Sequence, residues 1–172
     1  MRNFPLLDHS GLAVVGRGGA AVSDLSELQS RQRASLYADP LSWLVFDAVG
    51  QAVNELGEKI LSAKNTVGHI VVSDQCTTFT MLEIGTSIPA GRFSPLRFSG
   101  ANPGLICTLP SQLLGFSGPS LVLSMPPDAG LPPAMTVARA WLRERMASHV
   151  FVTYHLEDAS GHRVVTTVFQ QE

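Results

Sequence analysis

The strongest candidate nucleophiles in this chain are two cysteines, Cys76 and Cys107. Cys76 follows a short apolar run, and a thiol at a strand-to-helix junction can have a lowered pKa because the helix amides favour the thiolate. One hypothesis is therefore a small acyltransferase or thioester-handling enzyme that uses Cys76 or a histidine. The small apolar residues around Cys107 favour a packed thiol instead. Two cysteines are too few for a disulfide framework or a zinc site, and they indicate a reduced, cytoplasmic compartment.

Histidines are the next candidates, for acid–base chemistry or metal binding. No two of them have the spacing of metal ligands on one helix, and no Ser, His and acid arrangement is evident. His69 and His155 fall in expected strands, where histidines with satisfied hydrogen bonds are the simpler interpretation. We therefore expect no metal site. The five histidines are His9, His69, His149, His155 and His162.

A glycine-rich run at residues 16–21 (Gly-Arg-Gly-Gly-Ala-Ala) follows the apolar residues 12–15 and loosely fits a dinucleotide-binding fingerprint. Such a site needs a helix that starts at once, so that its first amides meet the phosphates. Asp24 and Glu27 lie near the next helix start, where they would repel phosphate and could instead form a capping box. A glycine turn is the favoured interpretation, and we expect no cofactor.

Composition narrows the classes of function. The 172 residues are enough for one domain with a real core, which we take to cover 1–172. The net charge of −2 gives no electrostatic case for nucleic acid. No apolar run has the length of a membrane helix or a secretory signal, so we expect no membrane association. Because hydrophobic residues reach 45% and charged residues only 15%, much apolar surface must be hidden in a core or an interface.

Periodicity predicts an α/β fold in the order strand, helix, strand, helix, strand, helix, strand, strand. Asp39 and Pro40 open the clearest helix, which Gly57 ends, and a tight turn at 158–161 joins the last two strands. We expect a mostly parallel five-stranded sheet with an antiparallel last strand and helices on both faces. The expected strands are 12–15, 67–73, 120–125, 150–156 and 163–169; further helices are 76–85, 105–114 (interrupted by Pro110) and 132–146, and 88–103 is a loop.

Several short motifs in the middle of the chain resemble the β-ketoacyl synthase family. Ketosynthases carry a similar run of Ser-Pro and Phe-Ser, an Asn, a helix, and then Leu-Gly-Leu-x-Gly-Pro-Ser before a strand. The resemblance extends from about residue 39 to the end and implies a thiolase-like half-unit, the N-terminal half of a ketosynthase. The matching residues here are Phe93-Ser94-Pro95, Phe98-Ser99, Asn102-Pro103, and 114–120 (Leu-Gly-Phe-Ser-Gly-Pro-Ser), followed by 138–142 (Ala-Arg-Ala-Trp-Leu) and a strand at Val150.

The same resemblance implies a chain without catalytic residues. In the family, the strand after Gly-Pro-Ser leads into a sharp elbow that bears the catalytic Cys. Counting from Gly118, that position is Pro127. Proline has neither a nucleophilic atom nor the backbone N–H that an oxyanion hole needs. The family's two catalytic histidines come from a second half, and we expect this chain to hold only the first. It therefore resembles the chain length factors of type II polyketide systems, which also lack the nucleophile and shape the end of the acyl tunnel.

The resemblance also implies a partner, an active ketosynthase subunit in a hetero-oligomer. Ketosynthases pair through the strand that follows Gly-Pro-Ser, which corresponds here to Ser120, Leu121, Val122, Leu123, Ser124 and Met125. A structural homodimer without a biosynthetic role is a further hypothesis. We expect five apolar residues to line the partner face or an acyl tunnel, with plain core as an equal alternative: Met81, Leu82, Phe93, Phe98 and Phe116.

An acyl carrier protein is a second candidate partner, because such proteins are acidic. The candidate contacts are basic side chains, for which ordinary solvated charges are the alternative interpretation. They are Arg31, Arg33, Arg139, Arg143 and Arg145.

Overall fold

A computed structural model describes residues 11–28, 37–91 and 95–172 of the chain. Its centre is a five-stranded sheet in the order β1-β5-β4-β2-β3. Four strands run in one direction and β5 runs against them, because β2 pairs in parallel with β3 and β4, whereas β5 is antiparallel to β4 and β1. The sequence prediction of a mostly parallel sheet with an antiparallel last strand is thus confirmed. The strands are β1 (Leu12–Val22), β2 (Val67–Val72), β3 (Ser120–Leu123), β4 (His149–Asp158) and β5 (Gly161–Gln171).

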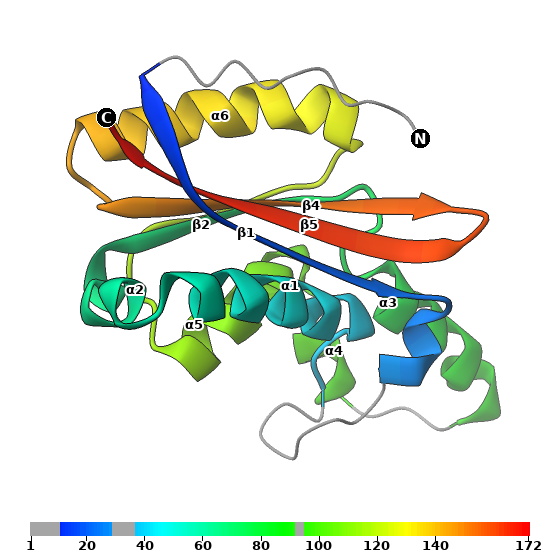
Figure 1. The fold of residues 1–172 in the computed structure, drawn as a ribbon. Helices are drawn as coiled ribbons and strands as arrows, with labels where there is room; N and C mark the ends of the chain where they lie inside the picture. Colours follow the sequence, from blue (N-terminus) through cyan, green and yellow to red (C-terminus); the bar gives the residue numbers. More distant parts are fainter. Residues whose placement is uncertain (1–10, 29–36, 92–94) are drawn as a thin grey trace.

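Helices cover both faces of this sheet, also as predicted. Figure 1 shows α6 (Pro127–Arg143) alone on one face and the other labelled helices on the opposite face. Those are α1 (Pro40–Leu56), α2 (Glu58–Ser62), α3 (Thr78–Ser87), α4 (Arg97–Gly100) and α5 (Thr108–Leu114), with the 3-10 turns η1 (Leu25–Leu28), η3 (Lys64–Thr66), η4 (Ile88–Ala90) and η5 (Pro103–Cys107). No helix in the described ranges is long and apolar enough to cross a membrane.

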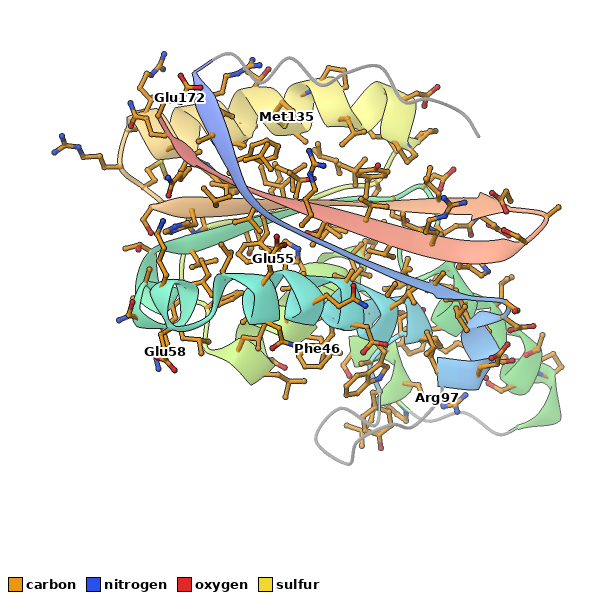
Figure 2. The ribbon with its side chains drawn as sticks, in the orientation of Figure 1. Phe46, Glu55, Glu58, Arg97, Met135 and Glu172 are labelled. Atoms are coloured by element: carbon orange, nitrogen blue, oxygen red, sulfur yellow. The ribbon has the colours of Figure 1, made fainter. Side chains whose placement is uncertain are left out.

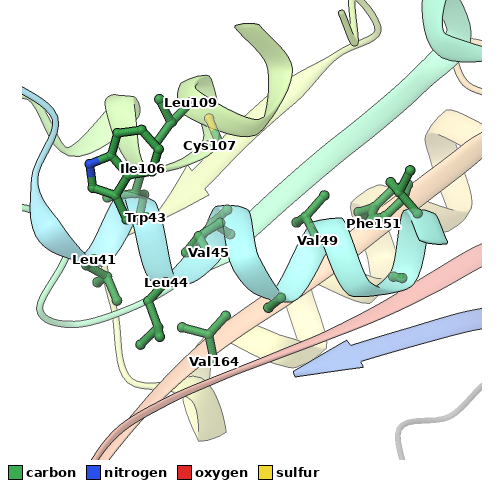
Figure 3. Close-up of a cluster of buried hydrophobic side chains, with 14 of the residues drawn as sticks. Leu41, Trp43, Leu44, Val45, Val49, Ile106, Cys107, Leu109, Phe151 and Val164 are labelled. Atoms are coloured by element: carbon green, nitrogen blue, oxygen red, sulfur yellow. The ribbon is translucent and has the colours of Figure 1, made fainter. Parts of the chain in front are cut away.

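Two hydrophobic clusters lie on the two faces. The larger one packs α1 and η5 against β2, β4 and β5. Figure 3 shows Leu44 of α1 pointing toward Val164 of β5. The smaller one packs Met135 and its neighbours on α6 against the other face. All six residues of β2 are buried, as expected for a strand covered on both sides. The sheet is therefore held in place on both faces, and the ends of its strands have fixed positions.

The start of α1 follows the predicted capping chemistry. The Asp39 carboxylate accepts a hydrogen bond from the Leu41 amide at 2.9 Å, and Pro40 occupies the first helical position. The second carboxylate oxygen accepts from the Thr80 amide at 3.0 Å, which ties α3 to the start of α1. Gly57 ends the helix with a φ of 59°. Asp24 and Glu27 likewise cap η1, since the Asp24 amide donates to Glu27 Oε1 at 3.2 Å.

The glycine-rich run 16–21 is not a turn, and it precedes no phosphate-binding helix, so both interpretations of it are wrong. It lies inside β1, which continues to Val22. The reason is the approach of α1: a Cβ at Gly18 would lie 2.1 Å from the Ala48 carbonyl oxygen and 2.8 Å from the Ala52 nitrogen. Glycine is needed here for close packing of a helix on a strand, not for a positive φ.

Proline positions account for the other differences from the predicted elements. Helix α6 begins at Pro127, and Pro132 and Pro133 lie inside it instead of starting it. Pro110 does not interrupt a helix, because α5 starts only at Thr108 and a proline is tolerated in a first turn. The stretch expected to be a loop, residues 88–103, contains the short helices η4 and α4. Residues 30–38, for which the sequence suggests a connector, lie mostly outside the described residues.

Candidate functional site

The turn between β3 and α6 contains no thiol, and Pro127 at its end has no nucleophilic atom. After Leu123 the chain passes through Ser124, Met125 and Pro126, and Pro127 is the first residue of α6. The carbonyl of Pro126 accepts hydrogen bonds from the amides of Ala129 at 3.0 Å and Gly130 at 2.9 Å. The Pro127 side chain is buried, and the residue has no N–H to donate. A covalent acyl intermediate cannot form at this position, and Pro127 offers no amide to an oxyanion.

Cys76 lies near this turn, at the carboxyl end of β2, but its thiol is held in the protonated form. Its Sγ donates to the Ser73 carbonyl at 3.1 Å and lies 3.3 Å from Ser124 Oγ. Burial raises the pKa of the Cys76 thiol, and the charges of Asp74 and Asp39 raise it further, against the lowering effect of the serine hydrogen bonds. The lowered pKa that the strand-to-helix position suggested is therefore not found. Cys76 also has a φ of 45°, a left-handed conformation that costs free energy for a side chain with a Cβ.

A chain of hydrogen bonds links this region to two histidines. Ser73 Oγ accepts from the amides of Gln75 and Cys76, at 3.2 and 3.0 Å, so both of its lone pairs are used. Its own hydrogen must then be donated to His155 Nδ1, 3.2 Å away. His155 therefore carries its proton on Nε2 and donates it to His162 Nδ1 at 3.0 Å. Hydrogen-bond counting thus fixes one direction of donation along the chain Ser73–His155–His162.

Three histidines are buried, His69, His149 and His155, and burial lowers the pKa of each. Burial lowers the pKa of His155 to about 4, and the neighbouring His162 contributes in the same direction. Burial likewise lowers the pKa of His69 to about 4, and its Nε2 lies 3.0 Å from Thr153 Oγ1. His69 and His155 both lie in strands, as expected. Both ring nitrogens of His155 have partners, whereas Nδ1 of His69 is buried with no hydrogen-bond partner among the described residues. The sequence could not show that Ser73, Cys76, His155 and His162 meet, because the contact depends on the order of strands in the sheet.

The apolar residues expected at a partner face fall into two groups. Met81, Leu82 and Phe98 are exposed by 50%, 65% and 47%, on α3 and α4. Phe116 lies in the buried core, with its ring centroid 5.5 Å from that of Phe151, so plain core describes this residue. Phe93 lies outside the described residues.

Sequence reasoning missed two members of the exposed apolar surface. Ile88 and Leu96 are exposed by 53% and 61%, in a stretch expected to be a loop. Arg97 of α4 lies 3.6 Å from Glu83 of α3, so an ion pair joins the two helices that carry this surface. We call Met81, Leu82, Ile88, Leu96 and Phe98 the α3–α4 apolar surface. The sequence signal for this surface was that Leu96 lies two residues before the Phe98-Ser99 motif.

Strand β3 lies at one edge of the sheet and has an open side. The amide of His69 donates to the carbonyl of Pro119, and the amide of Ser73 donates to that of Leu123. The backbone groups of the odd-numbered residues of β3 therefore point toward β2. The backbone groups of Ser120 and Val122 therefore face away from β2. Within the described ranges no backbone partner meets them, and the side chains of the strand are only half-buried. Ser124 and Met125, also expected at the interface, follow the strand.

The arginines expected to meet a carrier protein are only partly described. Arg139 lies on α6, Arg143 ends that helix and pairs with the adjacent Glu144 at 3.4 Å, and Arg145 follows with a φ of 58°. Arg31 and Arg33 lie outside the described residues. No group of three or more His, Cys, Asp or Glu side chains in the described ranges is arranged to hold a metal ion.

Solved structures with the same fold include ketosynthases and complexes of a ketosynthase with a chain length factor. A chain of the ishigamide ketosynthase/chain length factor superposes with a TM-score of 0.74 and 12% identity, over 94% of this chain and 62% of that one. A type II polyketide acyl carrier protein in complex with its ketosynthase gives a TM-score of 0.69 at 14% identity, with the same two coverages. A ketosynthase in complex with its chain length factor from Xenorhabdus doucetiae gives 0.65 at 13%, over 94% and 79%.

These likenesses show the thiolase-like fold that the sequence resemblance implied. The chain spans about 62% of the length of the first two chains it matches. No protein-family model matches the sequence. No curated protein matches it either.

Proposed function

We propose that this chain is a non-catalytic, ketosynthase-like subunit, similar in role to a chain length factor, that pairs with an active ketosynthase in type II polyketide or fatty-acid-type biosynthesis. The observation that carries the proposal is Pro127, the first residue of α6 directly after β3. In the ketosynthases that the sequence resembles, the catalytic Cys occupies this turn. A fold shared with such enzymes, combined with an inert residue at that turn, favours a supporting role over a catalytic one.

The proposed partner surface has two parts. The open side of β3 offers the backbone groups of Ser120 and Val122 to a strand of the partner, together with half-buried side chains of Leu121 and Leu123. An edge strand of this kind pairs readily with another chain. The α3–α4 apolar surface adds exposed side chains that a partner, or an acyl tunnel formed with it, would cover. One of the similar structures is a ketosynthase in complex with its chain length factor, and another is an acyl carrier protein in complex with its ketosynthase.

An enzyme that uses Cys76 is the alternative from a different class. Against it stand the raised pKa of the thiol and its donation to the Ser73 carbonyl. A thiol with a raised pKa is a poor nucleophile at neutral pH, because the thiolate is the reactive form. His155 does not take the proton of the Cys76 thiol directly, because Ser73 lies between the two residues in the hydrogen-bond chain. Arg139, Arg143 and Arg145 remain our candidates for contacts with a carrier protein.

A proline at position 122 tests the partner surface. Val122 directs its N–H away from β2, so Val122→Pro removes a donor from the open side and leaves the ladder to β2 intact. Val122→Ala is the matched control, because it removes the same packing without blocking the edge. The tagged chain is expressed in its source organism, and ketosynthases that co-purify are identified by peptide sequencing.

The expected result is a ketosynthase with an intact catalytic Cys that co-purifies with the wild-type chain and with Val122→Ala, and is lost with Val122→Pro. Equal recovery with all three chains would remove β3 from the interface. Recovery of this chain alone, as a homodimer, would favour the structural alternative.

A further inference from the structure

The outer edge of β1 is already occupied by side chains of the same molecule. The Arg17 amide donates to Glu55 Oε2 at 2.8 Å, and the Gly19 amide donates to Gln51 Oε1 at 3.1 Å. Both acceptors belong to α1, which crosses over this strand. Figure 2 shows Glu55 on the side of α1 that faces the sheet. Two of the outward amides in the middle of β1 therefore already have partners, and a second chain could not pair with them without displacing Glu55 and Gln51.

The spacing of these two contacts matches the geometry of the two elements. Arg17 and Gly19 are two residues apart in a strand, which is about 6.7 Å. Gln51 and Glu55 are four residues apart in a helix, which is about 6 Å. Two consecutive outward amides of β1 can thus be met by two side chains one helical turn apart. Gly18 permits this, since any Cβ there would collide with the α1 backbone at Ala48 and Ala52.

The two edges of the sheet are therefore different. At β3 the backbone groups of Ser120 and Val122 face outward and have no backbone partner in the described ranges. At β1 the Arg17 and Gly19 amides are held by α1. A sheet with two open edges can add chains at both and grow without limit, whereas a sheet with one open edge stops after a single addition.

We infer that this chain accepts one partner through its sheet, at β3, and that Gln51 and Glu55 close the β1 edge to a second one. The inference rests on the proposed partner role of β3. It specifies the stoichiometry: a closed pair and not a fibre or a ladder of subunits. If the β1 edge were open, β3 of one copy could pair with β1 of the next copy. That pairing would occupy β3 and prevent it from binding the ketosynthase.

The test uses the full chain with the double substitution Gln51→Ala and Glu55→Ala. Its matched control is Asn54→Ala with Glu58→Ala, which also removes one amide and one carboxylate from exposed positions nearby. Sedimentation velocity over a range of concentrations is expected to show assemblies larger than a pair for the Gln51/Glu55 variant only. Adding Val122→Pro to that variant is expected to abolish them, because growth from β1 needs an open β3.

Amide hydrogen exchange on the isolated wild-type chain gives a second measurement that does not depend on how the variant folds. The Arg17 and Gly19 amides are expected to exchange more slowly than those of Ser120 and Val122. Exchange of all four at the same fast rate, or a Gln51/Glu55 variant no larger than its control, would overturn the closure of β1. Both of these outcomes concern only the β1 edge and leave the proposed function unaffected. The proposed partner role of β3 is contradicted by a different result, in which Val122→Pro still binds the ketosynthase.

Discussion

Two neighbouring glycines in β1 meet different surroundings. A Cβ at Gly18 would lie 2.1 Å from the Ala48 carbonyl oxygen, whereas a Cβ at Gly19 would meet only the Val164 carbonyl oxygen at 3.6 Å. Backbone atoms of α1 cannot move away from Gly18 without separating the helix from the sheet. We expect Gly18→Ala to lower the free energy of unfolding by roughly 3 kcal/mol, and Gly19→Ala by less than about 1 kcal/mol. Urea unfolding midpoints measure both, and equal midpoints would contradict the close packing.

The buried histidines make stability depend on pH in a defined window. The unfolded pKa of a histidine is about 6.5, and those of His69 and His155 in the folded chain are about 4. Below 6.5 the unfolded state takes up protons first, so stability falls as the pH decreases towards 4 and is unaffected by these groups above 7. At about 1.4 kcal/mol per pKa unit, the loss approaches roughly 3 kcal/mol for each histidine.

Urea unfolding at pH 7.5, 6 and 5 measures this loss, and NMR titration assigns it to single rings. His155→Gln, which keeps hydrogen-bonding atoms but cannot take up a proton, is expected to reduce the pH dependence and to leave the part due to His69 and His149. A His155 ring that titrates near 6.5 in the folded chain would contradict the direction of hydrogen bonds from Ser73 to His162.

Helix α6 contains prolines in two different situations. Pro127 stands at the first helical position, where its missing N–H costs nothing, but Pro132 and Pro133 stand inside the helix and remove two backbone hydrogen bonds. Both of these prolines are exposed, so their rings contribute little packing. We expect Pro133→Ala to raise the free energy of unfolding by about 1–2 kcal/mol, after allowing for the greater freedom of the unfolded chain. Thermal unfolding measures this gain as a higher midpoint. Pro127→Ala is the comparison variant, and its midpoint is expected not to rise, because Pro127 is buried at the first helical position.

At the scale of elements, most of the fold was predictable from local patterns. The helix that starts at Asp39, the buried strand β2 and the turn at 158–161 each have a complete signal within a few residues. The length of β1 does not, because its glycines look like a turn until α1 is placed against Gly18. The predicted start of α6 was wrong for a different reason: paired prolines usually precede a helix, but here they lie inside it. In β1, packing against α1 overrode the local signal.

The candidate site was predictable only where it depends on position along the chain. Pro127 follows from counting after Gly118, and β3 follows from its apolar residues. The meeting of Cys76 with Ser124, and of Ser73 with His155, requires the strand order β4-β2-β3 and the antiparallel return of β5. The burial of Phe116 against Phe151 likewise joins segments 35 residues apart. Sequence alone therefore identified the residue types but not their contacts.

At the scale of the whole molecule, the sheet has an open edge at β3 and an edge at β1 where α1 holds two amides, and the turn before α6 ends at Pro127. The open edge at β3 and the α3–α4 apolar surface fit a subunit that is completed by another protein. The closed edge at β1 fits a pair and not an extended array. In the proposed complex, the covalent chemistry belongs to the partner, because Pro127 has no nucleophilic atom.

Mass spectrometry of the complex after exposure to an acyl thioester tests this account most directly. The native measurement gives the composition of the complex purified through the tagged chain, and the denatured subunit masses show which subunit carries the acyl group. We expect one copy of this chain with one ketosynthase, and an acyl adduct on the ketosynthase alone. An acyl adduct on this chain, at Cys76 or elsewhere, would contradict the central claim.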